Sequence, residues 1–111
     1  MSFIDRRAHE RVQYTAGEGP RLTVRDASYQ VLDCSERGLL LARTGDALAE
    51  TGLDVQGKIR FPTGVEVTVE GVVVRAQEDA IAIQFTGLWI PRDVILAELR
   101  RLRQGLTTRD E

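Results

Sequence analysis

Arginines cluster near the start of the chain, in the segment 6–11 (RRAHER). Arg7 and Arg11 are four residues apart, so their side chains would project together from a turn. A guanidinium group can fork onto phosphate oxygens or onto the O6/N7 edge of guanine, and it can also stack flat on a purine. The segment therefore fits an anion clamp, although a solvated charged tail would have the same composition.

A second polar segment, 33–38 (DCSERG), falls between two predicted strands. There Asp33 could accept from the N–H donors of guanine, Ser35 could donate to a phosphate or bond a base edge, and Gly38 would let the backbone approach a ligand. The competing interpretation is an ordinary turn. In that case Asp33 and Ser35 bond local backbone N–H groups and Gly38 takes a positive φ.

Catalytic and metal-binding patterns are poorly represented. His9 is the only histidine, so a Ser-His-Asp triad would have to use it. Cys34 is the only cysteine, no base is indicated beside it, and we expect a small, partly buried thiol. Neither GxGxxG nor GxxxxGK[ST] occurs. We therefore expect no enzyme, no catalytic residue, no metal site and no cofactor.

Composition restricts the class of protein further. The chain has 111 residues, of which 42% are hydrophobic, and a formal net charge of −2. This fits one globular domain and argues against a dedicated duplex-DNA binder, which carries a basic excess. No apolar run approaches the roughly 20 residues of a membrane span, and residues 1–12 lack a signal-peptide pattern. We expect a cytoplasmic protein without membrane insertion.

The elements that would position the two polar segments are mostly strands. Residues 20–85 contain six short runs with period-2 alternation between turn signals, such as Val65, Val67 and Val69. Gly71 interrupts the longest run, as a bulge or a barrel corner would require. With no helical pattern between the runs, the sequence predicts an antiparallel meander or Greek-key barrel.

A helix is predicted over 88–106. Pro91 suits a first helical position, and an apolar stripe follows along Ile95, Leu99, Leu102 and Leu106. We expect the stripe to pack on the barrel; a coiled-coil or partner-binding helix is the alternative, and a homodimer is left open. The predicted organisation is a flexible arm (1–19), a barrel with its helix (20–106) and a polar tail (107–111).

Taken together, the two polar segments resemble the PilZ domain family. That family has RxxxR in a leading arm and DxSxxG at a strand–turn–strand, matched here by Arg7 and Arg11 and then by Asp33, Ser35 and Gly38. Residues 69–75 resemble its penultimate strand, 81–85 its last strand and 88–102 its closing helix. Many members have glycine in the last strand where this chain has Ala82.

The resemblance implies a bacterial receptor for cyclic di-GMP, built as a mainly β, six-stranded antiparallel barrel with a C-terminal α-helix packed on it. Arg7 and Arg11 would grip guanine edges and phosphates, Asp33 and Ser35 would hold the base, and Gly38 would shape the turn. An arginine immediately before the motif is associated in this family with an intercalated ligand dimer. Arg6 occupies that position, so the resemblance favours the dimer.

The expected function is that of a receptor or adaptor whose N-terminal arm becomes ordered on ligand binding and signals to an unidentified effector protein. One alternative is a protein-interaction module of the same fold that does not bind nucleotide. Another is a barrel for single-stranded nucleic acid. Binding of single-stranded nucleic acid requires aromatic side chains interleaved with basic residues. Aromatic residues are only 5% of this chain, so we expect no nucleic-acid partner.

Overall fold

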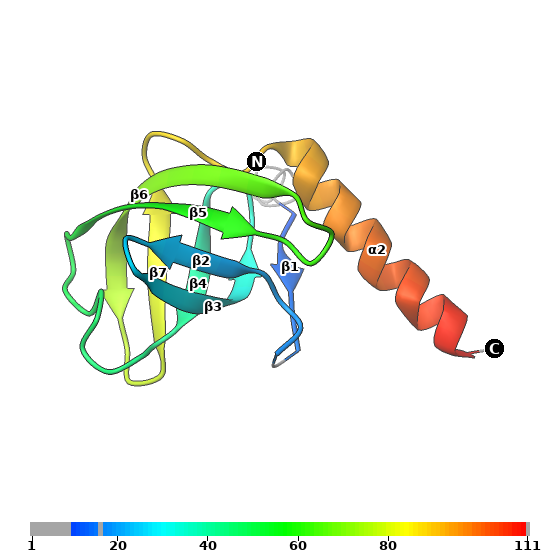
Figure 1. The fold of residues 1–111 in the computed structure, drawn as a ribbon, viewed down its shortest axis with the longest axis horizontal. Helices are drawn as coiled ribbons and strands as arrows, with labels where there is room; N and C mark the ends of the chain where they lie inside the picture. Colours follow the sequence, from blue (N-terminus) through cyan, green and yellow to red (C-terminus); the bar gives the residue numbers. More distant parts are fainter. Residues whose placement is uncertain (1–9, 16, 111) are drawn as a thin grey trace, which may run out of the picture.

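The computed structural model describes residues 10–15 and 17–110, with side-chain burial up to residue 103. In this part of the chain seven strands precede one helix (Figure 1). The strands are β1 (Val12–Gln13), β2 (Arg21–Val24), β3 (Ala27–Cys34), β4 (Gly38–Ala42), β5 (Asp54–Arg60), β6 (Glu66–Ala76) and β7 (Ala80–Phe85), and the helix is α2 (Arg92–Asp110).

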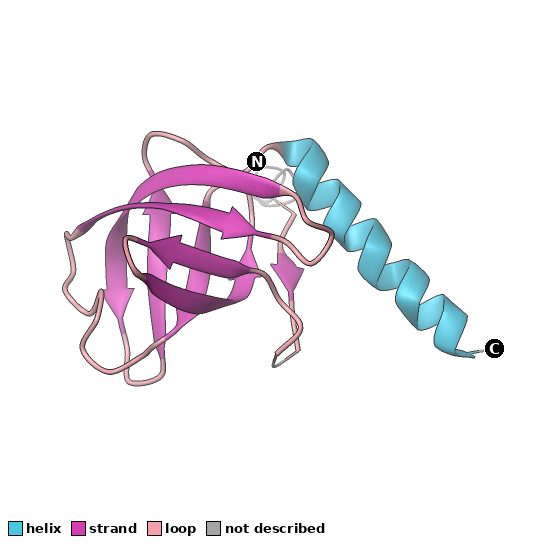
Figure 2. Ribbon diagram, viewed as in Figure 1, coloured by secondary structure: helices cyan, strands magenta, loops and turns pink. Residues whose placement is uncertain are grey.

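Six of the strands close into a barrel. Antiparallel pairs run in the order β3-β2-β5-β6-β7-β4, and β4 pairs back onto β3. Closure leaves no long free edge on which another chain could add a strand. The predicted six-stranded antiparallel barrel with a C-terminal helix is confirmed (Figure 2).

The seventh strand, β1, is an addition that the alternation did not reveal. It pairs with the far end of β3, where Val12 lies opposite Cys34 and Gln13 opposite Asp33. On the same edge, β2 pairs only with residues 27–30 of β3. The second half of β3 therefore has β4 on one side and the N-terminal segment on the other.

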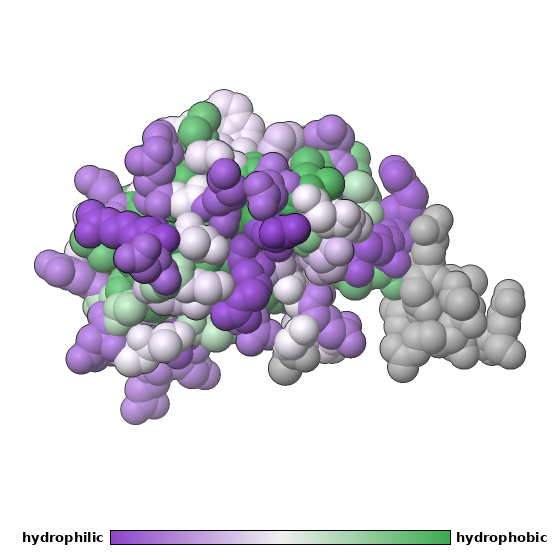
Figure 3. Space-filling model, viewed as in Figure 1, coloured by the Kyte–Doolittle hydropathy of each residue, from purple (hydrophilic) through white to green (hydrophobic). Residues whose placement is uncertain are grey.

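The core fills the inside of the barrel, as the alternation predicted for most positions. Hydrophilic side chains cover most of the face seen in Figure 3. Val69 is buried, but Val65 is exposed because it precedes β6. The register of β6 shifts between Val73 and Arg75 rather than at Gly71. The largest fully buried apolar side chains include Leu22, Val31, Leu41, Ile59, Phe61, Val73, Ile81, Ile90 and Ile95.

Helix α2 begins later and ends later than the pattern predicted. The carbonyl of Pro91 accepts from the N–H groups of Val94 and Ile95, so Pro91 caps the helix instead of being its first residue. Leu88 is outside the helix because its carbonyl accepts from the backbone N–H of Glu70 in β6. The helix continues through residues 107–110, and its C-terminal end projects away from the barrel (Figure 1).

The predicted stripe does pack on the barrel over the residues whose burial is described. Ile95 is fully buried, and Leu99 and Leu102 pack against the core. Leu106 lies outside the described side chains. The interpretation of the stripe as a barrel-packing face is thus the one that the structure supports.

Candidate functional site

One arginine and one carboxylate from the two predicted motifs meet at the barrel surface. Arg11 directly precedes β1, and the pairing of β1 with β3 brings it beside Asp33. An Nη1 of Arg11 donates to Oδ1 of Asp33 at 2.6 Å, with the Arg11 side chain 54% exposed and that of Asp33 14% exposed. Such a charge-assisted hydrogen bond holds the carboxylate in one orientation.

The Arg11–Asp33 pair borders a cleft of about 360 Å³ over the outer surface of β4, β6 and β7. Two more guanidinium groups, from Arg37 and Arg75, line it. Its apolar lining includes Leu40 and Ala82, which are directly paired across β4 and β7. Several cationic donors, one carboxylate and a flat apolar floor suit a ligand with phosphate groups and aromatic faces.

Arg37 and Arg75 were not among the predicted site residues. Arg37 lies within the second motif segment, two residues after Ser35, and Arg75 ends the longest run of valines. The register shift between Val73 and Arg75 alters the alternation at that point. A charged residue that ends an apolar run was the only sequence signal that marked Arg75.

Ser35 and Gly38 occupy the turn between β3 and β4. Ser35 is 1% exposed; its Oγ accepts from the backbone N–H of Arg37 at 3.1 Å, and its own N–H donates to the carbonyl of Gly38 at 2.9 Å. This is the local turn bonding that the sequence left open, and Ser35 does not line the cleft. Its direct contact with a ligand stays a prediction.

The positive φ that the ordinary-turn interpretation required at Gly38 is not found, because the positive-φ glycines of the described chain are Gly17, Gly45, Gly52 and Gly64. The physical reason for glycine at position 38 is close strand packing. A Cβ there would collide with the carbonyl oxygen of Ile83 in β7. Gly38 does line the cleft, which agrees with a role near the ligand. Arg6 and Arg7 lie outside the described residues.

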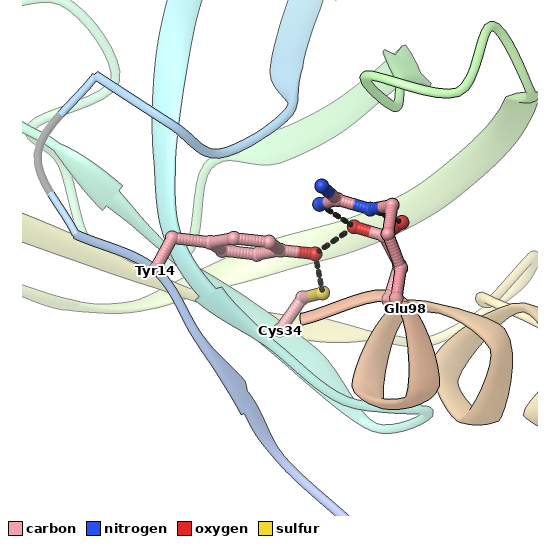
Figure 4. A network of polar contacts seen from close by, with 4 residues as sticks. Tyr14, Cys34 and Glu98 are labelled. Carbon is pink, nitrogen blue, oxygen red and sulfur yellow. Dashed lines mark hydrogen bonds and ion pairs between the residues drawn. The ribbon is translucent and has the colours of Figure 1, made fainter. Parts of the chain in front are cut away.

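A partly buried polar network joins the N-terminal segment to the helix (Figure 4). The Tyr14 hydroxyl donates to Oε1 of Glu98 at 2.7 Å, and it lies 3.9 Å from the Sγ of Cys34. Glu98 is only 3% exposed, and Arg101 donates to both of its carboxylate oxygens, at 2.9 and 3.0 Å. The carboxylate is therefore paired and hydrogen-bonded, as burial of a charge requires.

Burial also shifts the acidity of the groups in this network. Desolvation raises the pKa of the Cys34 thiol to about 12. It raises the pKa of Tyr14 as well, with the neighbouring Cys34 and Glu98 adding to the effect. The hydrogen bonds to Glu98 raise the pKa of Arg101. A buried, protonated thiol is inert as a nucleophile, so Cys34 is a packing residue, as expected.

This network was not among the predicted sites, although the sequence contains one signal of it. Glu98 follows Ile95 by three residues and directly precedes Leu99, so it stands on the buried face of the helix. An acidic residue on an apolar stripe predicts a buried partner. Its identity depends on the tertiary structure, because Tyr14 is 84 residues away in the chain.

The described residues contain neither a metal-binding cluster nor a membrane-spanning helix. No group of three or more His, Cys, Asp or Glu side chains there is arranged to hold a metal ion. Nor does that part of the chain contain a helix with the length and hydropathy needed to cross a bilayer.

Comparison with known proteins agrees with the fold. The family model of the PilZ domain matches residues 5–102. The chain belongs to the PilZ domain family. This match begins within the predicted arm, so the family unit includes the RxxxR segment as well as the barrel and most of α2.

Among solved structures, the PilZ chain is similar to the crystal structure of an uncharacterized Legionella protein. The two share 18% sequence identity with a TM-score of 0.58, over 88% of this chain and 98% of the other. That likeness shows the fold alone. No curated protein matches the chain significantly.

Proposed function

We propose that this PilZ domain is a receptor for cyclic di-GMP, a binding module and not an enzyme. The observation that carries the proposal is the meeting of Arg11 and Asp33 at the edge of the cleft. These residues come from separate motifs, 22 positions apart, and the fold brings them to one surface. Membership of a family of cyclic di-GMP receptors supports the same ligand.

The chemistry of the cleft matches the chemistry of this ligand. Cyclic di-GMP has two anionic phosphates and two purine faces, and a guanidinium recognises both kinds of group. Arg11, Arg37 and Arg75 supply such groups around an apolar floor. The Asp33 carboxylate is an acceptor for the N–H donors of guanine. From the resemblance, Arg6 and Arg7 would add two more guanidinium groups, and Arg6 favours an intercalated ligand dimer.

Signalling would follow from the position of the arm. The segment that carries the arginines is continuous with β1, which pairs with β3 beside the cleft. A ligand that holds Arg6, Arg7 and Arg11 at once would order the N-terminal arm against the barrel and change the surface shown to an effector protein. In keeping with the sequence analysis, we place this signalling in the bacterial cytoplasm.

One set of observations favours the second candidate, a PilZ-fold interaction module that does not bind nucleotide. Asp33 is already paired with Arg11, and Ser35 already bonds its own turn. The motif residues thus have structural partners within the protein itself. Calorimetry separates the two candidates, because only a receptor releases or absorbs binding heat.

Titration calorimetry of the folded protein with cyclic di-GMP tests the proposal. We expect saturable heat for the wild type, with two ligand molecules per chain if the dimer binds. Arg11→Ala and Asp33→Ala each remove one charged hydrogen-bonding partner, which should weaken binding roughly 10- to 150-fold.

Arg60→Ala is the matched control, because Arg60 pairs with Glu66 and does not line the cleft. It should bind like the wild type. Absence of heat from folded wild-type protein would overturn the receptor and favour the interaction module. Equal binding by Arg11→Ala, Asp33→Ala and the wild type would remove this cleft as the site.

A further inference from the structure

A second cleft adjoins the first, on the other side of Arg37. It has a volume of about 410 Å³ and is lined by Glu36, Arg37, Phe85, Thr86 and Trp89. These residues come from the β3–β4 turn, the end of β7 and the loop that leads to α2. Arg37 borders both clefts, so a ligand in the first can reach the second across one guanidinium group.

Trp89 is the unusual residue of this second cleft. Its side chain is 59% exposed, whereas a tryptophan in a small domain normally contributes its large apolar area to a core. Leu88, the preceding residue, is also exposed. Nucleic-acid bases stack on protein surfaces that present an exposed aromatic ring beside a cationic group.

The backbone around Trp89 is tied to the barrel. The N–H groups of Thr86 and Gly87 both donate to the carbonyl of Glu70, and the Glu70 N–H donates back to the carbonyl of Leu88. On the opposite wall, the Phe85 N–H donates to the carbonyl of Arg37 at 2.8 Å. The loop and the turn are thus held to neighbouring strands, so a base entering the cleft would meet walls already held in place.

The carboxylate of Glu36 would favour guanine over adenine in this cleft. Its side chain is 24% exposed, and an Nη1 of Arg92 at the start of α2 lies 3.6 Å from its Oε2. A carboxylate accepts only, so it suits the adjacent N1–H and N2–H donors of guanine. The corresponding edge of adenine has an acceptor at N1, which a carboxylate would repel.

We propose that Trp89, Glu36 and Arg37 form a second guanine subsite, in which the ring of Trp89 stacks on the base and Glu36 accepts from its donor edge. Arg37 contacts a phosphate between this subsite and the cleft beside Asp33. The inference rests on the proposed function, because the base belongs to cyclic di-GMP bound across both clefts.

Trp89 is the only tryptophan of the chain, so selectively excited tryptophan fluorescence reports on this subsite. Cyclic di-GMP is titrated into the full chain while fluorescence and binding heat are followed in parallel. We expect the fluorescence to be quenched along the same isotherm as the heat. Trp89→Ala should weaken binding roughly 5- to 150-fold, while Trp89→Phe, which keeps an aromatic face, should recover most of the loss.

Leu88→Ala is the matched control, since Leu88 is the exposed neighbour of Trp89 and does not line the cleft. Glu36→Gln should lower the ratio of the affinity for cyclic di-GMP to the affinity for cyclic di-AMP. Glu66→Gln on β6 should leave this ratio unchanged. Circular dichroism checks that each variant is folded; the Trp89 and Glu36 variants replace side chains outside the core.

The outcomes separate this inference from the proposed function. Binding heat without any change in tryptophan fluorescence, or with equal affinity for Trp89→Ala and the wild type, would overturn the second subsite and leave the receptor standing. An unaltered preference in Glu36→Gln would overturn the role of that carboxylate. If folded wild-type protein gives neither heat nor quenching, the proposed function fails and the second subsite fails with it.

Discussion

At the scale of single residues, burial decides what Cys34 can do. The sequence placed this cysteine between two motif residues, where a reactive thiol was conceivable. In the barrel its side chain is fully buried beside the Tyr14 hydroxyl, and desolvation raises the pKa of the thiol to about 12. Cys34 of the motif segment is thereby part of the core, directly next in the chain to Asp33 of the candidate site.

This burial predicts a loss of stability at high pH. An unfolded chain releases the thiol proton near the ordinary pKa of 9.0, whereas the folded chain retains it up to about pH 12. Between these values the unfolded state binds fewer protons than the folded state, so the free energy of unfolding falls as the pH rises. One such group contributes a slope of at most about 1.4 kcal/mol per pH unit. Tyr14, whose pKa is also raised, acts in the same direction above its ordinary value.

Urea unfolding of the wild type and Cys34→Ser at a series of pH values between about 8 and 10.5 measures this effect. The serine hydroxyl does not titrate in this range, so the variant should lose stability less steeply with pH. Identical slopes for the two proteins would show that folding does not raise the pKa of the Cys34 thiol. The slopes are compared rather than the absolute stabilities, because the substitution also changes core packing.

At the scale of elements, a polar cluster as well as an apolar stripe attaches α2. Ile95 supplies buried apolar surface, but Glu98 fixes the rotation of the helix, because its carboxylate has hydrogen-bond partners in only one arrangement. Tyr14, which follows β1, is one partner, and Arg101 of the same helix is the other. The helix is thus joined to the segment that carries Arg11.

Tyr14→Phe tests this attachment. The substitution keeps the ring and removes the hydroxyl that donates to the Glu98 carboxylate, so the free energy of unfolding should fall by about 1.5–3 kcal/mol. Tyr29→Phe is the control: Tyr29 is buried where Tyr14 is partly buried, and the Tyr29 hydroxyl has no hydrogen-bond partner among the described residues. Equal effects of the two substitutions on the urea midpoint would contradict a specific role for the Tyr14–Glu98 hydrogen bond.

At the scale of the whole molecule, ligand binding and stability are thermodynamically linked, because the cleft forms only when the barrel closes. The cleft exists only where β3, β4 and β7 are paired and the N-terminal segment lies along β3. An unfolded chain has no such surface. A ligand of this site must therefore stabilise the entire domain, by an amount that depends on its free concentration relative to Kd.

Thermal unfolding with cyclic di-GMP measures this linkage. At a free concentration 100 times Kd, the gain is about 2.7 kcal/mol, which should raise the Tm by roughly 10 °C for a domain of this size. At the same ligand concentration Arg11→Ala should show a much smaller rise, and Arg60→Ala should match the wild type. A rise of equal size in Arg11→Ala would place the ligand outside the cleft.

The strand alternation, the packing face of α2 and the two motif segments could be predicted from the sequence, because each depends on residues that are close together in the chain. Period-2 patterns identified Ile59 and Ile81 as core positions, and both are fully buried. Gly38 was identified from its motif, but its close packing against Ile83 could not be predicted, because Ile83 comes from another strand.

Contacts between side chains that are distant in the chain could not be predicted in this way. The Arg11–Asp33 pair, the Tyr14–Glu98 hydrogen bond and the cleft between Arg37 and Trp89 all depend on strand register and on how the barrel closes. Local alternation shows which face of a strand is buried, but it does not show which strand will lie beside it. For the same reason the exposure of Trp89 could not be foreseen: a hydrogen bond between Glu70 and Leu88 keeps that part of the chain out of the helix.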